Sequence, residues 1–265
     1  MQIVRTIADV RRLLRPLLGG QTVALVPTMG AFHDGHVALF RAADAASDCV
    51  VASLFVNPTQ FNNPADLTAY PRDEPRDARI AEASGVDLLF APGVEEMFPP
   101  DHATWVAIEG AAQGLEGEFR PNHFRGVATV CLKLFTIVRP HMAFFGQKDA
   151  QQVAVIKQLA RDLNLDLVIR VEPTVRDADG LALSSRNVRL SAEERQRALS
   201  IPRALQAGHA AYLAGGDAVA AARAMLVGVE PEYVAIANFD GQPTLAVAAC
   251  VGAIRLIDNI PLGER

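Results

Sequence analysis

The fold of this chain is decided by residues 25–40, Leu-Val-Pro-Thr-Met-Gly-Ala-Phe-His-Asp-Gly-His-Val-Ala-Leu-Phe, in which an apolar strand turns into a helix. Thr22–Pro27 is a nearly continuous apolar run, which is typical of a parallel strand buried on both faces. From His36 onward, the apolar residues follow a helical spacing. The stretch therefore predicts a buried strand that is followed at once by a helix.

Two histidines, His33 and His36, lie at this junction, and Gly30 and Gly35 allow the backbone of the turn to approach a ligand closely. A helix N-terminus offers unpaired N–H groups and partial positive charge, which favour a bound anion. Both imidazoles can face one side of the turn, donate to phosphate oxygens and stabilise a departing pyrophosphate. The alternatives are that the two histidines are ordinary polar residues of a loop or half of a metal site. Because no cluster at metal-ligand spacing accompanies the pair, we expect no protein metal site.

Composition narrows the class of protein. The chain has 265 residues, half of them hydrophobic, which is enough for one large domain or two smaller ones. A net charge of −5 gives no basic footprint for nucleic acid. Cys49, Cys131 and Cys250 are odd in number and far apart, which predicts buried free thiols in a reducing compartment. No stretch is as long as a membrane span and no secretory signal begins the chain, so we expect a cytoplasmic protein without membrane association.

The first part of the chain alternates strands with helices, which favours an α/β fold. Gly126–Val138 is the clearest helix, and Asp149–Leu163 is another. This alternation predicts a doubly wound parallel sheet with helices on both faces and binding sites beyond the carboxyl ends of its strands. The predicted strands are Thr22–Pro27, Cys49–Val56, Asp87–Ala91, His141–Phe145 and Asp166–Val171.

The pattern changes after about residue 174. Ser191-Ala-Glu-Glu194 is a capping box that opens a long alanine-rich helical region, which Pro202 is expected to bend, and a second helix is expected from Asp217. Three short strands follow. We therefore expect a first domain over residues 1–173 and a smaller α+β domain over residues 174–265, with no flexible linker between them. The three strands are Glu232–Asn238, Thr244–Cys250 and Ala253–Asp258.

Two amides, Asn57 and Gln60, lie in the loop that follows the second predicted strand. An amide both donates and accepts hydrogen bonds, which suits a small hydroxy acid without adding charge. The alternative is that both amides satisfy backbone groups of their own loop. Tyr70, in the next loop, is a candidate pocket wall or a packing residue.

Lys148 lies in Phe-Gly-Gln-Lys-Asp (residues 145–149), where another strand passes into a helix. Helix N-termini favour acidic side chains, so a lysine there is better explained by a bound polyphosphate that supplies the negative charge. The alternative is an ordinary solvated lysine.

Ser184, Ser185 and Arg186 lie where the two predicted domains meet, and they offer two hydroxyls and a guanidinium to phosphate oxygens. A serine nucleophile is the competing interpretation, but neither serine lies in a G-x-S-x-G turn, so phosphate binding is favoured. Another polar loop precedes a helix and offers candidate contacts for an acidic ligand: Arg120, His123 and Arg125.

Together these blocks resemble the pantothenate synthetase (pantoate:β-alanine ligase) family over most of the chain. The H-x-G-H block alone would indicate only a wide group of nucleotidyltransferases and class I aminoacyl-tRNA synthetases, whereas its combination with the other blocks is far more specific. The blocks are PTMGAFHDGH (27–36), FVNPTQF (55–61), YPRD (70–73), HFRGVATV (123–130), FFGQKDAQQ (144–152), DGLALSSRN (179–187) and RLIDN (255–259).

The resemblance implies a Rossmann-like nucleotidyltransferase fold and a two-step, ATP-dependent ligation. Pantoate would attack the α-phosphorus of ATP to give pantoyl adenylate and pyrophosphate. β-Alanine would then displace AMP to give pantothenate, the precursor of coenzyme A. The resemblance also implies Mg²⁺ that arrives with ATP, a second domain that closes over the active site, and a homodimer.

The family's site residues carry over to matching positions. His36 is the residue usually called the proton donor, and we expect His33, His36, Lys148 and Arg186 to be catalytic, mainly by stabilising charge. The implied contacts with pantoate or β-alanine are Gln60, Gln152, Asn57, Tyr70 and Arg120. The implied contacts with ATP are Met29, Gly30, Ala31, Phe32, His33, Asp34, Gly35, His36, Gly146, Gln147, Lys148, Asp149, the backbone at Val175, and Leu183, Ser184, Ser185 and Arg186.

One departure from the family is a short C-terminal half, with a compact run between Gly208 and Pro231. Two other functions remain as alternatives. A nucleotidyltransferase of the same superfamily would leave the nucleotide on its product. A non-catalytic nucleotide-binding module would lack some of the charged donors, all of which this chain retains.

Overall fold

The computed structural model describes residues 1–17, 19–239 and 241–263. The chain forms two compact units. The first comprises Met1–Gly146 and Val155–Glu172, and the second comprises Gln147–Ala154 and the residues from Pro173 onward. The division expected at residue 173 put Gln147–Ala154 in the first domain, whereas the structure groups this segment with the second unit.

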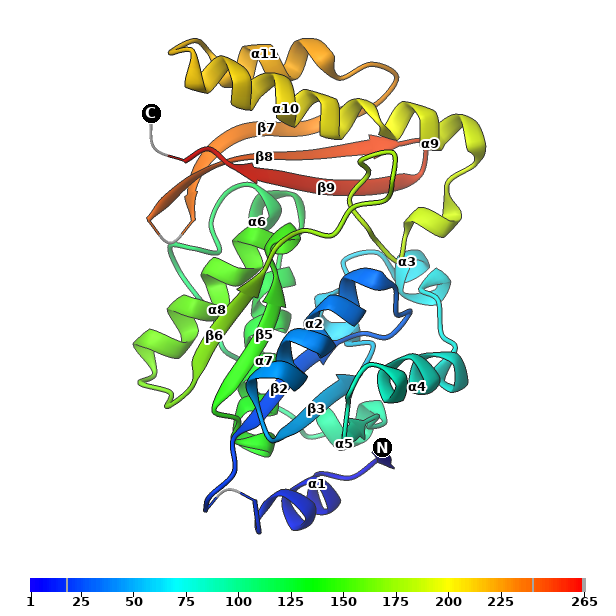
Figure 1. The fold of residues 1–265 in the computed structure, drawn as a ribbon, viewed down its shortest axis with the longest axis vertical. Helices are drawn as coiled ribbons and strands as arrows, with labels where there is room; N and C mark the ends of the chain where they lie inside the picture. Colours follow the sequence, from blue (N-terminus) through cyan, green and yellow to red (C-terminus); the bar gives the residue numbers. More distant parts are fainter. Residues whose placement is uncertain (18, 240, 264–265) are drawn as a thin grey trace. The chain divides into compact units, whose positions relative to one another are not determined.

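The first unit contains a six-stranded sheet in the order β1-β4-β3-β2-β5-β6, and every neighbouring pair is parallel (Figure 1). The predicted doubly wound parallel sheet is therefore confirmed. The five predicted strands correspond to β2–β6, and β1 was not predicted. The bounds are β1 Gln2–Val4, β2 Val23–Thr28, β3 Cys49–Leu54, β4 Leu88–Phe90, β5 Met142–Gly146 and β6 Val168–Glu172.

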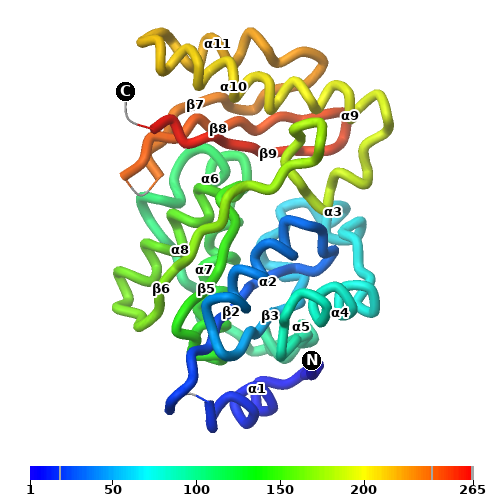
Figure 2. The backbone as a smooth tube through the Cα atoms, viewed as in Figure 1, coloured from blue at the N-terminus to red at the C-terminus, as the bar shows by residue number. Residues whose placement is uncertain are grey.

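The helices of this unit cover the sheet from both sides. The chain steps from β2 to β4 in one direction and returns to β5 and β6 on the other side of β2 (Figure 2). Because parallel crossovers are right-handed, the two directions place their helices on opposite faces. On one face, Phe40 of α2 and Ala81 of α4 pack against Val26, Ala52 and Leu89 of the strands. The helices are α1 Ile7–Leu14, α2 Asp34–Ala46, η1 Pro58–Gln60, α3 Pro64–Ala69, α4 Glu74–Ala83, α5 Val94–Met97, α6 Glu116–Phe119, α7 His123–Val138 and α8 Ala150–Asp162, of which the residues from Val155 onward belong to this unit.

The strand order reverses at β2, which pairs with β3 on one edge and with β5 on the other. The register sets Ala24 beside Met142 and Leu25 beside Ala143. The turn that leaves β2 and Gly146 at the end of β5 therefore lie at the same carboxyl edge of the sheet. Ligands of open α/β sheets bind at such a reversal point.

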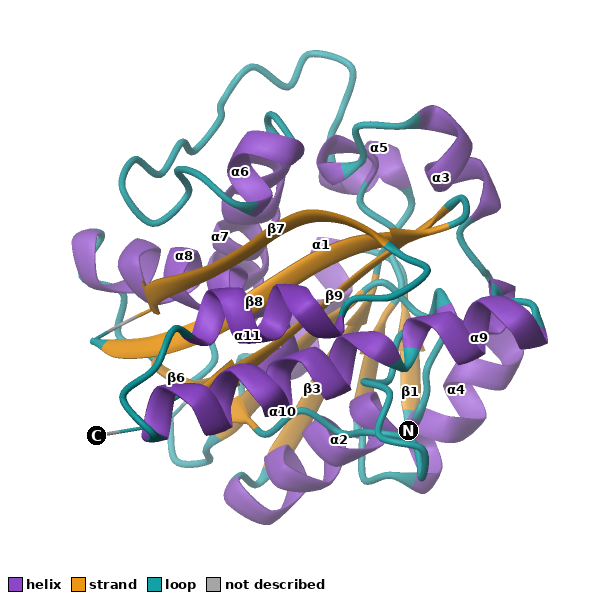
Figure 3. Ribbon diagram, turned by 90° about the horizontal axis from the view of Figure 1, so that it is seen from above, coloured by secondary structure: helices purple, strands orange, loops and turns teal. Residues whose placement is uncertain are grey.

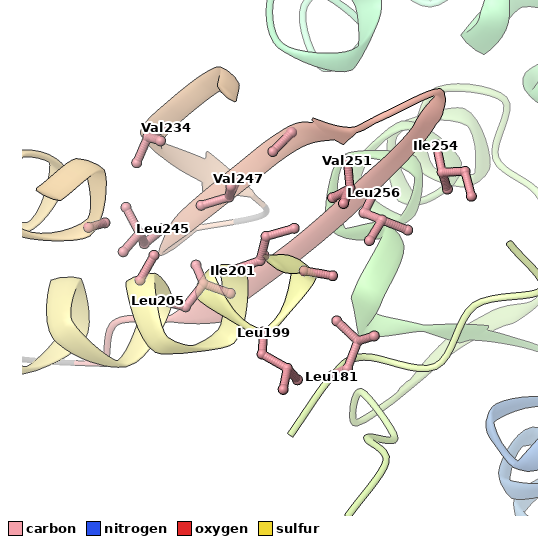
Figure 4. Packing of buried hydrophobic residues seen from close by; sticks show 14 of the residues in the cluster. Leu181, Leu199, Ile201, Leu205, Val234, Leu245, Val247, Val251, Ile254 and Leu256 are labelled. Atoms are coloured by element: carbon pink, nitrogen blue, oxygen red, sulfur yellow. The ribbon is translucent and has the colours of Figure 1, made fainter. Parts of the chain in front are cut away.

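The second unit has an antiparallel sheet in the order β7-β8-β9, and α10 packs against β8 and β9 (Figure 3). Leu199, Ile201 and Leu205 from the helical region meet Leu245 and Leu256 of the sheet in an apolar core (Figure 4). The predicted smaller α+β fold is confirmed. The elements are η2 Gln147–Asp149, η3 Asn187–Arg189, α9 Ala192–Ala198, α10 Ser200–Leu213, α11 Ala218–Met225, β7 Glu230–Phe239, β8 Gln242–Val251 and β9 Ile254–Pro261.

The helix boundaries of this unit follow local chemistry. The Ser191 side chain accepts from Glu194 N at 3.2 Å, and the Glu194 carboxylate accepts from Ser191 N at 2.8 Å, so the predicted capping box is confirmed. The predicted bend at Pro202 is instead a break at Leu199 between α9 and α10. Pro202 then lies in the first turn of α10, where its missing N–H leaves no hydrogen bond unmade.

The three cysteines are free thiols, as predicted, and Cys49 and Cys131 are buried, whereas Cys250, also predicted to be buried, is half-buried. Burial raises the pKa of Cys49 to about 11 and that of Cys131 to about 12, so both thiols stay protonated at neutral pH. Within the described ranges of the chain, no helix is long and apolar enough to cross a membrane.

Gly208→Ala is expected to destabilise the second unit. A Cβ at this position of α10 would lie 2.8 Å from the carbonyl oxygen of Ala218 and closer still to Leu245. Overpacking of this kind costs about 1–3 kcal/mol, which outweighs the gain of about 1 kcal/mol in helix propensity. Thermal denaturation followed by circular dichroism measures the effect. Gly20→Ala is the control, since nothing lies within 4 Å of its Cβ position, and equal stability of the two variants would contradict the packing argument.

Candidate active site

The turn between β2 and α2 brings His33 and His36 together, as the sequence predicts. Their ring centroids are 4.2 Å apart. His33 is the N-cap of α2, and its Nδ1 accepts from the backbone N–H of Gly35 at 3.2 Å. The Nδ1 of His36 accepts from the backbone N–H of His33 at 3.3 Å. The helix therefore begins at Asp34, two residues before the predicted start, and the two histidines cap it reciprocally.

This cap fixes the tautomer of both rings. A neutral imidazole has one donor nitrogen and one acceptor nitrogen, and here both Nδ1 atoms accept. The ring proton of each neutral histidine is therefore on Nε2. Each ring thus has an N–H donor on the atom opposite the one that caps the helix, which is the arrangement that charge stabilisation at an anion requires.

The backbone of the same turn is held by Asp77, which belongs to α4. Its carboxylate accepts from Ala31 N at 2.7 Å and from Phe32 N at 2.8 Å, and its side chain is only 1% exposed. These bonds stabilise a turn in which Gly30 has φ 81° and Ala31 has φ 54°. Burial raises the pKa of Asp77, while the two backbone N–H groups and the nearby Arg76 act in the opposite direction.

Asp77 was not predicted as a site residue from the sequence. One signal was present: Asp77 and Ala81 are four residues apart and are the buried positions of α4, so a carboxylate lies on the apolar stripe of this helix. A buried carboxylate needs hydrogen-bond donors. The sequence could not show that these donors belong to the turn after β2.

Gln60 lies close to Met29 of this turn, because its Nε2 donates to Met29 Sδ at 3.1 Å. Asn57 donates to Gln60 Oε1 at 2.9 Å and to Gly126 O at 3.2 Å, and its own oxygen accepts from Thr59. Asn57 therefore orients Gln60 and also satisfies loop groups, which was the alternative interpretation. Its predicted contact with substrate stays a prediction.

Other candidates surround the same loop of the first unit. His123 Nδ1 lies 3.0 Å from Gln60 O, and Arg120 donates to that oxygen at 3.4 Å and to Glu116 at 3.5 Å. The backbone of Gln60 is thus tied to the segment that precedes α7. Tyr70 is buried with its ring 5.7 Å from that of Phe61, so it packs against the same loop.

In the second unit, Val175 and Leu183 are neighbours, since Leu183 N donates to Val175 O at 3.0 Å. The chain between them forms a hairpin in which Arg176 bridges to Ala182. The hairpin leads into Ser184, whose Oγ accepts from Arg186 N at 3.2 Å. These residues, predicted to contact phosphate, therefore share one short segment.

Lys148, also in the second unit, lies in η2, the single 3₁₀ turn between β5 and α8. Gln151 follows on α8 and is 5% exposed, and Gln152 is half-buried. Across the part of the chain that the structure describes, no group of three or more His, Cys, Asp and Glu side chains could hold a metal ion.

Comparison with known proteins identifies the family. The sequence profile of pantoate–β-alanine ligases matches residues 2–261. The pantothenate synthetase of Roseiflexus sp. (strain RS-1) is 48% identical over 278 aligned residues, which cover 99% of this chain and 99% of the relative. That of Acidobacterium capsulatum is 47% identical, with 100% of this chain and 98% of the relative covered.

Solved structures agree with this match. Pantothenate synthetase from Thermus thermophilus superimposes with a TM-score of 0.94 at 42% identity and 100% coverage of both chains. Pantoate–β-alanine ligase from Francisella tularensis, whose crystal structure is of a complex with β,γ-ATP and β-alanine, has a TM-score of 0.87 at 36% identity, covering 99% of this chain and 98% of that one. Similarity of sequence and fold over nearly the whole length establishes that the chain belongs to the pantoate–β-alanine ligase family.

Proposed function

We propose that this chain condenses pantoate with β-alanine to give pantothenate, AMP and pyrophosphate, with ATP as co-substrate and pantoyl adenylate as intermediate. The observation that carries the proposal is the reciprocally capped histidine pair at the reversal point of the sheet, in a chain whose relatives include many pantothenate synthetases. The F. tularensis relative, with its nucleotide and β-alanine, supports the choice of substrates.

The chemistry requires activation of an unreactive carboxylate. A pantoate carboxylate oxygen forms a bond to the α-phosphorus of ATP, and the bond from that phosphorus to the bridging oxygen of pyrophosphate breaks. In the second step, the amine of β-alanine attacks the acyl carbon and AMP leaves with the carboxyl oxygen. A proton is released from the nitrogen as the amide forms.

The chain's donors match the charge that develops in the first step. We assign His33, His36, Lys148 and Arg186 to stabilising the α-phosphate and the leaving pyrophosphate, since preorganised donors act where charge grows. The Nε2 protons of the histidines suit hydrogen bonding to phosphate oxygens. For this reason, we assign His36 charge stabilisation in preference to proton transfer.

The remaining site residues follow the same division. We propose that Gln60 and Gln152 contact pantoate, with Gln60 also near β-alanine, and that Asn57, Tyr70 and Arg120 support this acid-binding region. The proposed contacts with ATP lie in residues 29–36 and 146–149, at Val175, and in residues 183–186. Mg²⁺ enters as part of the Mg·ATP substrate.

We further propose a second unit that closes over bound ATP, a homodimer and a cytoplasmic location. The three free thiols support the location, because reducing compartments keep cysteines unpaired.

Isotope exchange between pyrophosphate and ATP tests the reaction. We expect exchange with pantoate alone and none with β-alanine alone, because only the acid is adenylated. AMP is expected to form when both substrates are present. Exchange that proceeds equally with β-alanine would refute the proposal, and a stable nucleotidyl adduct in place of AMP would indicate a nucleotidyltransferase.

Lys148→Ala is expected to lower the adenylation rate by about a hundredfold or more, the effect of removing a preorganised transition-state donor. Pantoate-dependent exchange measures this rate. Lys157→Ala on α8 is the matched control and is expected to behave like the wild type. A folded Lys148→Ala protein with a near-normal rate would rule out the role given to this lysine.

Asp77→Asn is expected to raise the KM for ATP about tenfold, since an amide nitrogen cannot accept and one N–H of the β2–α2 turn loses its partner. Steady-state exchange kinetics at varied ATP concentration measure the change. Asp101→Asn, at an exposed position, is the control. Unchanged kinetics for Asp77→Asn would show that the turn does not depend on this carboxylate.

A further inference from the structure

The block RLIDN near the end of the chain has no role in the proposed chemistry, yet it forms most of β9. Its last two residues are polar and buried: Asp258 is 3% exposed and Asn259 is 4% exposed. Successive side chains of a strand point to opposite faces of the sheet. Leu256 faces the apolar core, so Asp258 belongs to the core face and Asn259 to the opposite face.

The Asn259 carboxamide is fully used by the turn that carries Lys148. Its Nδ2 donates to Gln147 O at 3.0 Å and to Lys148 O at 2.8 Å. Its Oδ1 accepts from Gln147 Nε2 at 3.3 Å. Two donor hydrogens and an acceptor oxygen on one planar group are the property of a carboxamide, so aspartate, serine or leucine could not make this set of bonds.

The strand that supplies Asn259 is held firmly in place. Asn259 is paired with Ala246 of β8, the central strand of its sheet. The neighbouring Asp258 binds Arg176 through two hydrogen bonds of 2.6 Å and 3.0 Å, and it also accepts from Asn259 N at 2.8 Å. The backbone that carries the Asn259 carboxamide is therefore fixed by the sheet. The Gln147–Asp149 turn is a single 3₁₀ turn, so its conformation depends more on such contacts from outside.

We propose that Asn259 is a positioning residue for Lys148: it fixes the backbone of Gln147 and Lys148 so that the lysine ammonium is presented to the polyphosphate of a bound nucleotide. The inference rests on the proposed role of Lys148. It gives the RLIDN block a function that acts through another residue, without direct contact with ATP.

A double-mutant cycle tests the coupling. Binding of a non-hydrolysable ATP analogue is measured by calorimetry for the wild type, Asn259→Ala, Lys148→Ala and the double variant. We expect Asn259→Ala to weaken binding of the analogue about fivefold or more when Lys148 is present, and less than about twofold in the Lys148→Ala background. The reason is that the effects of substitutions within one hydrogen-bond network do not add. Equal factors in the two backgrounds, the result of a merely structural role, would overturn the proposal.

Amide hydrogen exchange provides a readout that needs no nucleotide. Asn259→Ala is expected to accelerate exchange in the peptide that contains residues 147–152, because the turn loses its tether. Asn238→Ala, at an exposed position of β7, is the matched control and should leave this peptide unchanged. If the exchange rate of this peptide is unchanged in Asn259→Ala, Asn259 does not hold the turn in place and the proposal is wrong.

The two proposals can fail separately. If the wild type binds the ATP analogue but shows no pantoate-dependent pyrophosphate exchange, the proposed reaction fails and the positioning of Lys148 stands. If the wild type does not bind the analogue, both fail. If Asn259→Ala does not fold, Asn259→Ser, which keeps one hydrogen-bond donor, takes its place in the cycle. Its effect on affinity for the analogue is again expected to be larger when Lys148 is present than when it is absent, but the difference is expected to be smaller.

Discussion

The parallel pairing of β2 along both of its edges is the constraint on which the first unit depends. A strand enclosed in this way must be apolar on both faces, and the residues from Val23 to Val26 are fully buried. Polar groups return only at its carboxyl end, where Thr28 N donates to Ser53 Oγ at 3.1 Å. The chain can leave the interior only beyond that point, so the turn with the histidines lies at the edge of the sheet.

Buried polar side chains from distant parts of the sequence fix the two functional turns. Asp77 accepts from the backbone N–H groups of the β2–α2 turn, and Asn259 donates to the carbonyls of the Gln147–Asp149 turn. The carboxylate of Asp77 can only accept and meets backbone N–H groups, and the amide nitrogen of Asn259 can only donate and meets backbone carbonyls. In both cases a regular element supplies the side chain, so the conformation of a short turn is set by a rigid neighbour in its own unit.

Much of this architecture could be predicted because burial imposes a pattern. Strands β2–β5 are apolar and mostly buried runs, and Ser191 and Glu194 form a local cap. β1 is only three residues long and has no such pattern. Chain order placed Gln147–Ala154 in the first domain, whereas the structure groups this segment with the second unit, where Asn259 donates to Gln147 and Lys148. Neither Asp77 nor Asn259 was predicted as a site residue, because the partners of both side chains are distant in sequence. The histidine pair was predicted because both of its members lie in one turn.

The reciprocal cap links the charge state of the histidines to the start of α2. An imidazolium ion has no lone pair to offer, so a second proton on either ring would take away the acceptor that a backbone N–H of the turn uses. A doubly protonated ring could therefore not accept from the backbone N–H of Gly35 or His33. The acceptor nitrogens of two side chains and the first backbone N–H groups of α2 are thus coupled within a single turn.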